Sequence, residues 1–243
     1  MTGRPSSQAA VWAILRNDLR VLFLAPAGWV FLTVCLFLAG LMFVGGVAET
    51  GEASLRPAIP QLAVTLLFTL PLVTMRQLAE EARSGTLELL LTAPVRVEAL
   101  VVGKWAAAMV LCVALLAATA PLPAVLHLYG DPDPGVLLTG YLGLFACCSA
   151  FCAAGLFASS LTRDPTVAGA LSVLLLLPSW LASAAVDWMP PAFAPFLHRI
   201  SFVDHLHGAA TGVLDSAELT WFAAVTLGFL LSARASLAWR RWR

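Results

Sequence analysis

Charged and apolar side chains lie close together in one short segment, residues 76–104, of a chain that otherwise contains few charges. The acidic and basic residues of this segment suit ion pairing, and Leu87, Leu89, Leu90 and Leu91 stand beside them. A solvated loop would not need so many leucines. Apolar side chains surrounded by charges are typical of surfaces that contact another protein, so we predict protein recognition here.

Covalent, nucleotide and metal chemistry have no comparable pattern. Ser149, Ser172 and Ser179 lie in apolar runs without a histidine or lysine to act as a base, which disfavours a hydrolase. The Walker A pattern that binds ATP phosphates is missing, so energy from ATP would have to come from a partner. Thiol and imidazole groups can bind transition metals, but their spacing gives no firm ligand set, and we predict no metal site. The residues considered are Cys147, Cys148, Cys152, His198, Asp204, His205 and His207.

The composition is that of a membrane protein. Hydrophobic residues make up 60% of the 243 residues and charged residues 12%, with a mean hydropathy of +0.88. Soluble domains are usually about 25% charged. The formal net charge of +0 gives no indication of nucleic-acid binding.

Six apolar runs are long enough to cross about 30 Å of hydrocarbon as helices. We therefore predict an all-α polytopic fold, with residues 1–243 forming a single transmembrane domain. The predicted transmembrane helices are residues 27–48, 59–75, 105–128, 136–161, 167–186 and 219–239.

Small residues are dense in the fourth predicted span, residues 136–161. Ala, Gly and Ser let helix backbones approach closely in lipid. Both packing within one chain and an interface between subunits are compatible with this pattern.

Basic residues are distributed unevenly between the two sides of these spans. Of 14 Lys and Arg residues, two, Arg56 and Arg199, fall on one side and the other twelve on the opposite side. The positive-inside rule makes the richer side cytoplasmic. We predict a multi-pass protein of a bacterial-type inner (plasma) membrane, with both termini cytoplasmic. The twelve residues are Arg4, Arg16, Arg20, Arg76, Arg83, Arg96, Lys104, Arg163, Arg234, Arg240, Arg241 and Arg243.

The stretch before the first span, residues 8–24, is amphipathic. Apolar residues recur at helical spacing on one face, and Arg16 and Arg20 lie on the opposite face, while Asp18 intrudes on the apolar side. Pro26 suits the first turn of the following helix. We predict an interfacial helix on the cytoplasmic leaflet, acting as a plain anchor or as a regulatory or partner-contacting element.

Local signals make residues 76–104 a helical hairpin. Helix-forming residues continue to residue 83, and Ser84-Gly85-Thr86 then breaks the helix, because Gly admits left-handed backbone and Ser or Thr caps helices. A short helix over residues 87–91 is predicted to stop near Pro94. On the other side, residues 187–218 are too apolar for free solution, and we predict helices in the outer interface.

Several motifs combine in a pattern with a family likeness. They are Thr74-Met75-Arg76, Ala79-Glu80-Glu81, residues 83–94, Gly103-Lys104, residues 140–144, residues 155–162 and Gly212-Val213-Leu214-Asp215. Together they resemble the signature of ABC-2-type transporter permeases, and the match is closest to the gliding-motility and nitrous-oxide-reductase-maturation branch. Thr211 stands where the gliding-type pattern has a basic residue.

The resemblance implies a membrane subunit that performs no covalent chemistry. Such permeases form dimers, and each copy docks on a separate ABC ATP-binding subunit through a coupling helix in the hairpin after the second span. ATP and Mg would be bound by that partner, and this chain would hold no cofactor. The outer segment would form short re-entrant helices. The residues that match the ATPase-coupling positions are Glu80, Glu81, Arg83, Gly85, Thr86 and Glu88.

We therefore expect a permease subunit that forms the membrane path as a homodimer, or as a heterodimer with a second permease. The family resemblance favours export over import, since the sequence shows no obvious docking site for a soluble binding protein, and the apolar interior suggests a lipid-like, amphipathic or polymeric substrate. An alternative is a force-transmitting or scaffold subunit of an ABC-powered envelope machine, of gliding or pilus type, that moves no solute. A secondary transporter is less favoured, because no ionisable residue lies in the middle of a predicted span.

Overall fold

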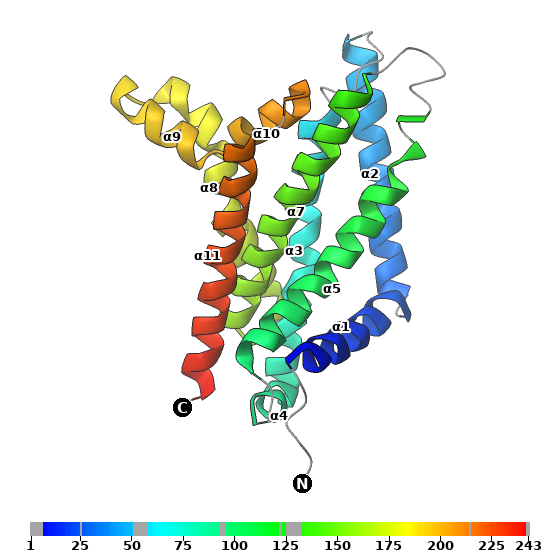
Figure 1. The fold of residues 1–243 in the computed structure, drawn as a ribbon, viewed down its shortest axis with the longest axis vertical. Coiled ribbons are helices and arrows are strands. Elements are labelled where there is room, and N and C mark those ends of the chain that lie inside the picture. The colour runs from blue at the N-terminus through cyan, green and yellow to red at the C-terminus, as the bar shows by residue number, and fades with distance from the viewer. Residues whose placement is uncertain are drawn as a thin grey trace.

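The chain folds into a bundle of long helices. In the described part of this computed structural model, every element of regular secondary structure is a helix, which confirms the predicted all-α fold. The long helices run side by side, and the last described helix, Ser216–Arg241, ends at the same end of the molecule as the first, Ser7–Leu24 (Figure 1). The structure describes residues 7–24, 26–50, 58–92, 96–121, 123–124, 133–213 and 215–241.

Six of the described helices are long and apolar enough to cross a membrane, as predicted. Short helices lie at the two ends of this bundle. We call the end with α4 (Thr86–Thr92) the α4 end and the end with α9 (Ala194–Ile200) the α9 end. The six long helices are α2 (Pro26–Thr50), α3 (Ala58–Ser84), α5 (Val97–Ala118), α7 (Pro134–Leu161), α8 (Pro165–Ala185) and α11 (Ser216–Arg241).

Two of these helices begin with the same local device. The carboxylates of Asp133 and Asp164 accept the backbone N–H groups of Gly135 and Thr166, each at 2.8 Å, at the start of α7 and α8. A proline follows each aspartate in the first helical turn. The aspartate satisfies a free donor, and proline has no donor to lose there, so both residues fix where the helix begins.

The helices on either side of the predicted hairpin extend beyond the predicted spans, as the helix-forming residues up to residue 83 indicated. α3 continues past the predicted end of its span at residue 75 to Ser84, and α5 begins at Val97 rather than at residue 105. Residues 76–83 are mostly strong helix formers, so a change from apolar to charged composition does not end the helix. The arms of the hairpin are therefore direct extensions of two long bundle helices.

α7 is the central helix and packs against α3, α5, α8, α10 (Phe202–Thr211) and α11. Its small residues make this possible: a methyl group added to Gly155 would collide with the side chain of Thr74 on α3. The small residues near Gly155 thus serve close packing within the chain, one of the two interpretations that the sequence left open.

One hydroxyl group fastens α7 to α3. Ser159 accepts the backbone N–H groups of Leu78 and Ala79, at 3.0 and 2.9 Å, and donates to the carbonyl of Met75 at 2.9 Å. A hydroxyl has one donor and two acceptor sites, so all its capacity is used. These bonds hold α7 against α3 one to two turns before α3 ends.

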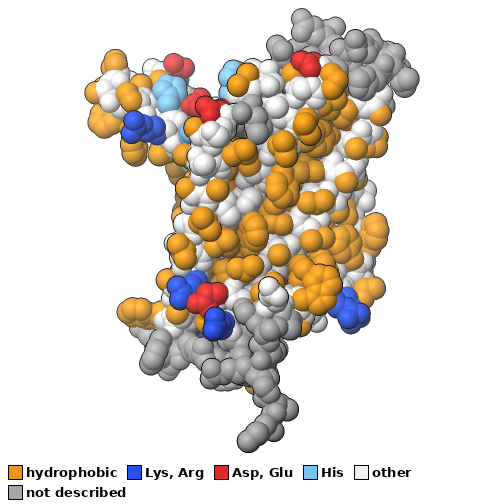
Figure 2. Space-filling view, viewed as in Figure 1, with side chains coloured by type: hydrophobic (Ala, Val, Ile, Leu, Met, Phe, Trp, Pro, Cys, Tyr) orange, Lys and Arg blue, Asp and Glu red, His pale blue; other side chains and the backbone are white. Residues whose placement is uncertain are grey.

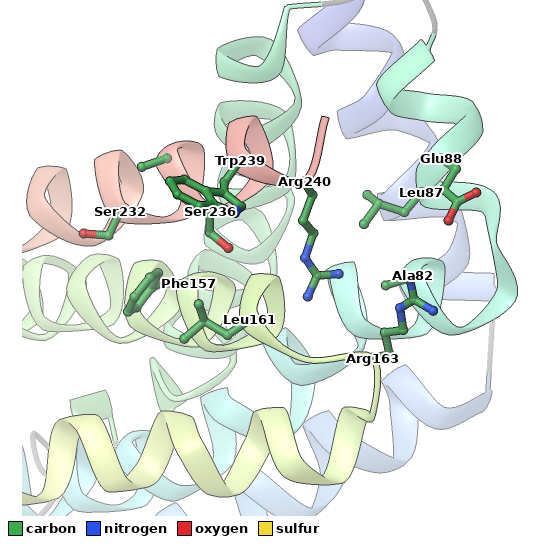
Figure 3. A pocket seen from close by; sticks show the side chains of 11 residues that line it. Ala82, Leu87, Glu88, Phe157, Leu161, Arg163, Ser232, Ser236, Trp239 and Arg240 are labelled. Carbon is green, nitrogen blue, oxygen red and sulfur yellow. The ribbon is translucent and has the colours of Figure 1, made fainter. Parts of the chain in front are cut away.

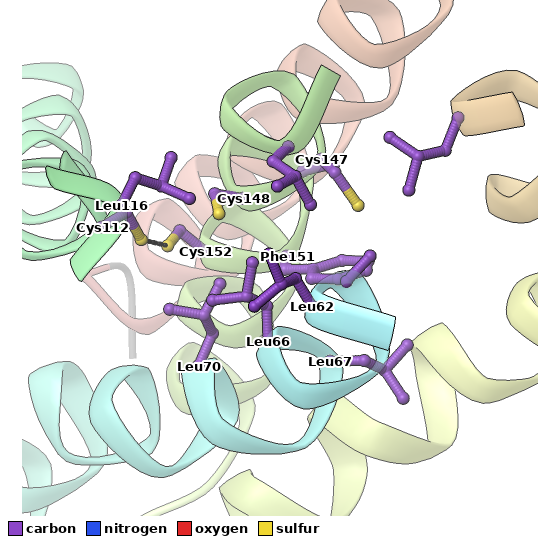
Figure 4. Close-up of a cluster of buried hydrophobic side chains, with 14 of the residues drawn as sticks. Leu62, Leu66, Leu67, Leu70, Cys112, Leu116, Cys147, Cys148, Phe151 and Cys152 are labelled. Carbon is purple, nitrogen blue, oxygen red and sulfur yellow. Dashed lines mark hydrogen bonds between the residues drawn. The ribbon is translucent and has the colours of Figure 1, made fainter. Parts of the chain in front are cut away.

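Buried apolar side chains form two clusters. The larger cluster centres on α3 and α7, where Leu67 and Phe151 are fully buried (Figure 4). The smaller one, at the α4 end, joins α3, α4, α5, α7 and α11, and we call it the basal cluster. Its buried members are Leu78, Leu87, Leu100, Val101, Leu156, Ala233 and Leu237.

Short helices connect α8 to α11 at the α9 end, as predicted for residues 187–218. They are η1 (Val186–Trp188), η2 (Pro191–Phe193), α9 and α10. Asp204 of α10 accepts a hydrogen bond from Ser183 at 3.0 Å and lies 2.7 Å from Nδ1 of His198, which fastens α10 to α8 and α9.

Charged side chains lie towards the two ends of the face shown in Figure 2, with hydrophobic side chains between them. α1 (Ser7–Leu24) lies across the α4 end and packs against α5 (Figure 1). The charged residues at the end of α3 and in α4 lie at the α4 end, where α1, α3, α4 and α5 meet.

Candidate functional site

α3 and α4 meet in a tight turn, and we call residues 80–92 the elbow. Gly85 stands between the two helices with a φ of +78°, a backbone conformation that suits glycine, and a Cβ there would meet no atom within 4 Å. Around it, Ser84 and Thr86 place their hydroxyl oxygens 2.9 Å apart, and Thr86 donates to the carbonyl of Glu81 at 3.3 Å. The predicted helix break at this position is confirmed.

The residues that match the family's coupling positions do not all face the same way. Glu81 is half-buried. Its side chain is 24% exposed and turns into the bundle towards Lys104. The others lie on the surface of the elbow. These exposed residues are Glu80, Arg83, Gly85, Thr86 and Glu88.

The leucines of α4 divide between the interior and the surface. Leu87 is only 3% exposed and belongs to the basal cluster, so the prediction that it contacts another protein is wrong. Leu89 is 71% exposed, and Leu90 is half-buried. The side chain of Leu91 and residue Pro94 lie outside the described part. α4 is thus anchored through one leucine and presents another outward.

A buried group of charges lies behind the elbow. Lys104, on α5, is only 2% exposed, and its Nζ lies 2.7 Å from Oε1 of Glu81 on α3 and 3.2 Å from Oδ2 of Asp18 on α1. Gln77 also donates to the backbone carbonyl of Lys104 at 3.0 Å. Two carboxylates offset the cost of burying one ammonium group, so the three side chains hold three helices together.

The sequence did not reveal that these charges pair. Lys104 was predicted at the end of the helical hairpin of residues 76–104, and the structure places it inside α5, where it is buried. Asp18 interrupts the apolar face of α1. That face packs against α5, and the Asp18 carboxylate pairs there with Lys104. The signals were present, as a lone acid on an apolar face and the only lysine of the chain.

A second ion pair, between Arg234 of α11 and Glu98 of α5, has a different environment. Its N–O distance is also 2.7 Å, but both side chains are about half exposed, at 51% and 50%. Water screens such a pair, so it contributes little to stability compared with the buried cluster.

A cleft of about 950 Å³ lies beside the elbow, between α4, α7 and α11 (Figure 3). Phe157 and Ser236 line it on the side of the bundle, and Arg163 and Arg240 line it towards the α4 end. Leu87 and Glu88 of the elbow form another wall. No local sequence pattern indicates this cleft, because Arg163 and Arg240 lie far apart in the chain.

The cysteines and histidines do not converge on a metal site within the described ranges. No group of three or more His, Cys, Asp or Glu residues there has the arrangement to hold a metal ion. Cys112 and Cys152 place their sulfur atoms 3.4 Å apart (Figure 4), and all five cysteines are free and buried.

Comparison with known families agrees with this architecture. The model of the ABC-2 family transporter proteins matches residues 54–231, which extend from α3 into α11 and make up well over half of the chain. This chain therefore belongs to the ABC-2 family of transporter membrane proteins, as a non-catalytic transmembrane component. A search of curated proteins finds no match.

Proposed function

We propose that this chain is the permease subunit of an ATP-binding-cassette exporter in a bacterial-type inner membrane. Two copies, or this chain and a second permease, form the membrane path. A separate ABC ATPase binds ATP and Mg and drives the path through the elbow. Family membership supports the transport role, and the anchored elbow is the observation that carries the coupling.

The elbow is built to pass movement into the bundle. α3 is one helix from the α9 end to Ser84, and α4 joins the basal cluster through Leu87. That cluster also contains residues of α5, α7 and α11. Because closely packed side chains cannot move independently, a displacement of α4 would shift these helices together.

The exposed side of the elbow offers the ATPase both charge and apolar area. Glu80, Arg83 and Glu88 are exposed and could pair with opposite charges on the ATPase, which favours the correct orientation of two proteins. Leu89 supplies an apolar contact among them. Glu81 acts in this scheme through Lys104, by holding α3 to α1 and α5, rather than by touching the ATPase.

The distribution of charge supports one orientation in the membrane. Among the described residues, the α4 end carries most of the arginines, including Arg16, Arg76 and Arg163, whereas Arg199 lies at the α9 end. We propose that the α4 end faces the cytoplasm, where an ATPase has access to ATP.

A charged substitution at Leu89 tests the docking role. Leu89→Asp, co-expressed with its ABC ATPase, should reduce the amount of ATPase that co-purifies by at least about tenfold, because a desolvated apolar contact is replaced by a charge. Trp188→Asp is the matched control, since Trp188 is 89% exposed at the α9 end. Equal ATPase recovery with both variants would contradict the proposal.

Solute movement separates an exporter from a force-transmitting subunit. ATP-dependent movement of a fluorescent amphiphile by the reconstituted complex supports the exporter. ATP hydrolysis without movement of any amphiphile or polymer would favour the alternative, and with it the gliding-type branch.

A further inference from the structure

We propose that the cleft between α4, α7 and α11 binds the headgroup of an anionic phospholipid, with Arg163 and Arg240 holding its phosphate. The inference concerns a ligand site apart from the elbow's exposed docking surface. It stands whether or not the ATPase docks as proposed.

The two arginines bring positive charge into one open cleft, where Arg163 is exposed and Arg240 is half-buried. Arg163 lies in the turn between α7 and α8, and Arg240 lies in the last turn of α11. Their side chains extend into the same part of the cleft (Figure 3). Like charges repel at short range, and a phosphate group between them would remove that repulsion and accept hydrogen bonds from both.

The surrounding carboxylates do not neutralise these arginines. Within the described ranges, no ion pair includes Arg163 or Arg240, whereas Arg234 on the same helix as Arg240 is paired with Glu98. Asp164 caps α8 by accepting the N–H of Thr166. Glu88 also lines the cleft, but no ion pair among the described residues joins its carboxylate to either arginine.

The remainder of the cleft suits the apolar part of a lipid. Phe157 and Leu161 of α7 and Trp239 of α11 line it, and Leu161 and Trp239 are 46% and 69% exposed. Both helices are membrane-spanning by length and composition, so the arginines stand where apolar helix surface gives way to charge. Tryptophan is enriched at this depth of a bilayer.

The hydroxyl groups in the cleft have partners of their own. Ser232 donates to the carbonyl of Gly228 at 2.8 Å, and Ser236 donates to the carbonyl of Ser160 at 3.2 Å. The recognition of a polar headgroup therefore depends on the two guanidinium groups, which favours a phosphate over a neutral sugar.

A phospholipid is the occupant that this combination favours. Arginines at one end of an apolar groove match the order of phosphate and acyl chain in a lipid, and basic pockets between membrane helices bind such headgroups. The volume of about 950 Å³ is at the upper end of small-molecule sites, about 300–1,000 Å³. Because Leu87 and Glu88 also line the cleft, a bound headgroup would stabilise the position of the elbow relative to α11.

Lipid retention by the purified full-length chain tests this site. Native mass spectrometry would compare phosphatidylglycerol with phosphatidylcholine on the parent protein, Arg163→Gln, Arg240→Gln and the double variant. We expect selective retention of phosphatidylglycerol, weakened about fivefold by each substitution and about 25-fold by both. Each basic residue near an anionic lipid strengthens binding by about fivefold. Arg163→Gln lies in a turn, so it remains informative if the double variant does not fold.

Arg234→Gln is the matched control and should retain phosphatidylglycerol like the parent, because its charge is already paired. Inorganic phosphate at millimolar concentration should not displace the lipid. Equal retention by the parent and the arginine variants would overturn the proposal. Displacement by phosphate alone would also overturn it, in favour of a soluble anion, as would unchanged lipid retention with loss of the co-purified ATPase, in favour of a partner surface.

Discussion

At the scale of single residues, the buried lysine dominates the energetics of the α4 end. Lys104→Met would leave Asp18 and Glu81 facing each other without a cation between them. Removing one partner of a buried ion group usually lowers stability by about 3–5 kcal/mol. We expect a marked fall in the unfolding temperature of the detergent-solubilised protein, and earlier proteolysis of α1.

Two comparisons make this prediction specific. Arg234→Met should lower stability by about 1 kcal/mol or less, because that pair is half exposed. The triple variant Lys104→Met, Asp18→Asn, Glu81→Gln should recover much of the loss, because it leaves no unpaired charge. A Lys104→Met protein as stable as the parent would show that the charge cluster contributes nothing to holding α1.

Residues that act locally could be predicted from the sequence, and those that act at a distance could not. Gly85 was identified because a break between two helix-forming runs requires only neighbouring residues. Lys104 and Ser159 depend on partners that are distant in the chain, at Asp18 and at the backbone of α3. Only the packing of the whole bundle brings these groups together, so no local pattern fixes their roles.

At the scale of elements, the elbow joins the short helix α4 to the long helix α3 through a turn at Gly85. Gly85→Pro requires a φ near −65° where the structure has +78°, so α4 should lose its position while the bundle remains intact. Gly85→Ala keeps the turn at a strain of about 1–2 kcal/mol. We expect stimulation of the partner ATPase to be abolished by proline and reduced by alanine, in reconstituted complexes.

Gly228 offers the control for these substitutions. It lies within α11, where a Cβ meets no atom within 4 Å, so Gly228→Ala should leave ATPase stimulation unchanged. Replacing glycine in a helix also removes a penalty of about 1 kcal/mol. Normal stimulation by the Gly85→Pro protein would rule out a coupling role for the elbow.

The helices themselves were predictable in number and kind, and to within a few residues in extent around the elbow. Apolar runs located all six long helices, because length and composition alone decide whether a helix can span a bilayer. The continuation of α3 beyond its apolar run was also predictable, since charged helix formers such as Glu80 and Arg83 favour helix up to the break at Gly85. That continuation gives the elbow its direct connection to the bundle.

At the scale of the whole molecule, the proposal depends on which side of the membrane the α4 end occupies. Ser84→Cys and Trp188→Cys place a thiol at exposed positions at opposite ends of the bundle. The five native cysteines are buried, so they provide a background that reacts slowly. In intact cells, a membrane-impermeant maleimide should label the Trp188→Cys protein and spare the Ser84→Cys protein.

Permeabilised cells supply the control, because both thiols should then react to a similar extent. The expected pattern follows from the uneven distribution of arginines, which disfavours moving the α4 end across the membrane. Labelling of the Ser84→Cys protein from outside intact cells would show that the α4 end faces outward, opposite to the proposed orientation. The elbow would then be separated from cytoplasmic ATP, and an ATPase could not drive the bundle through α4.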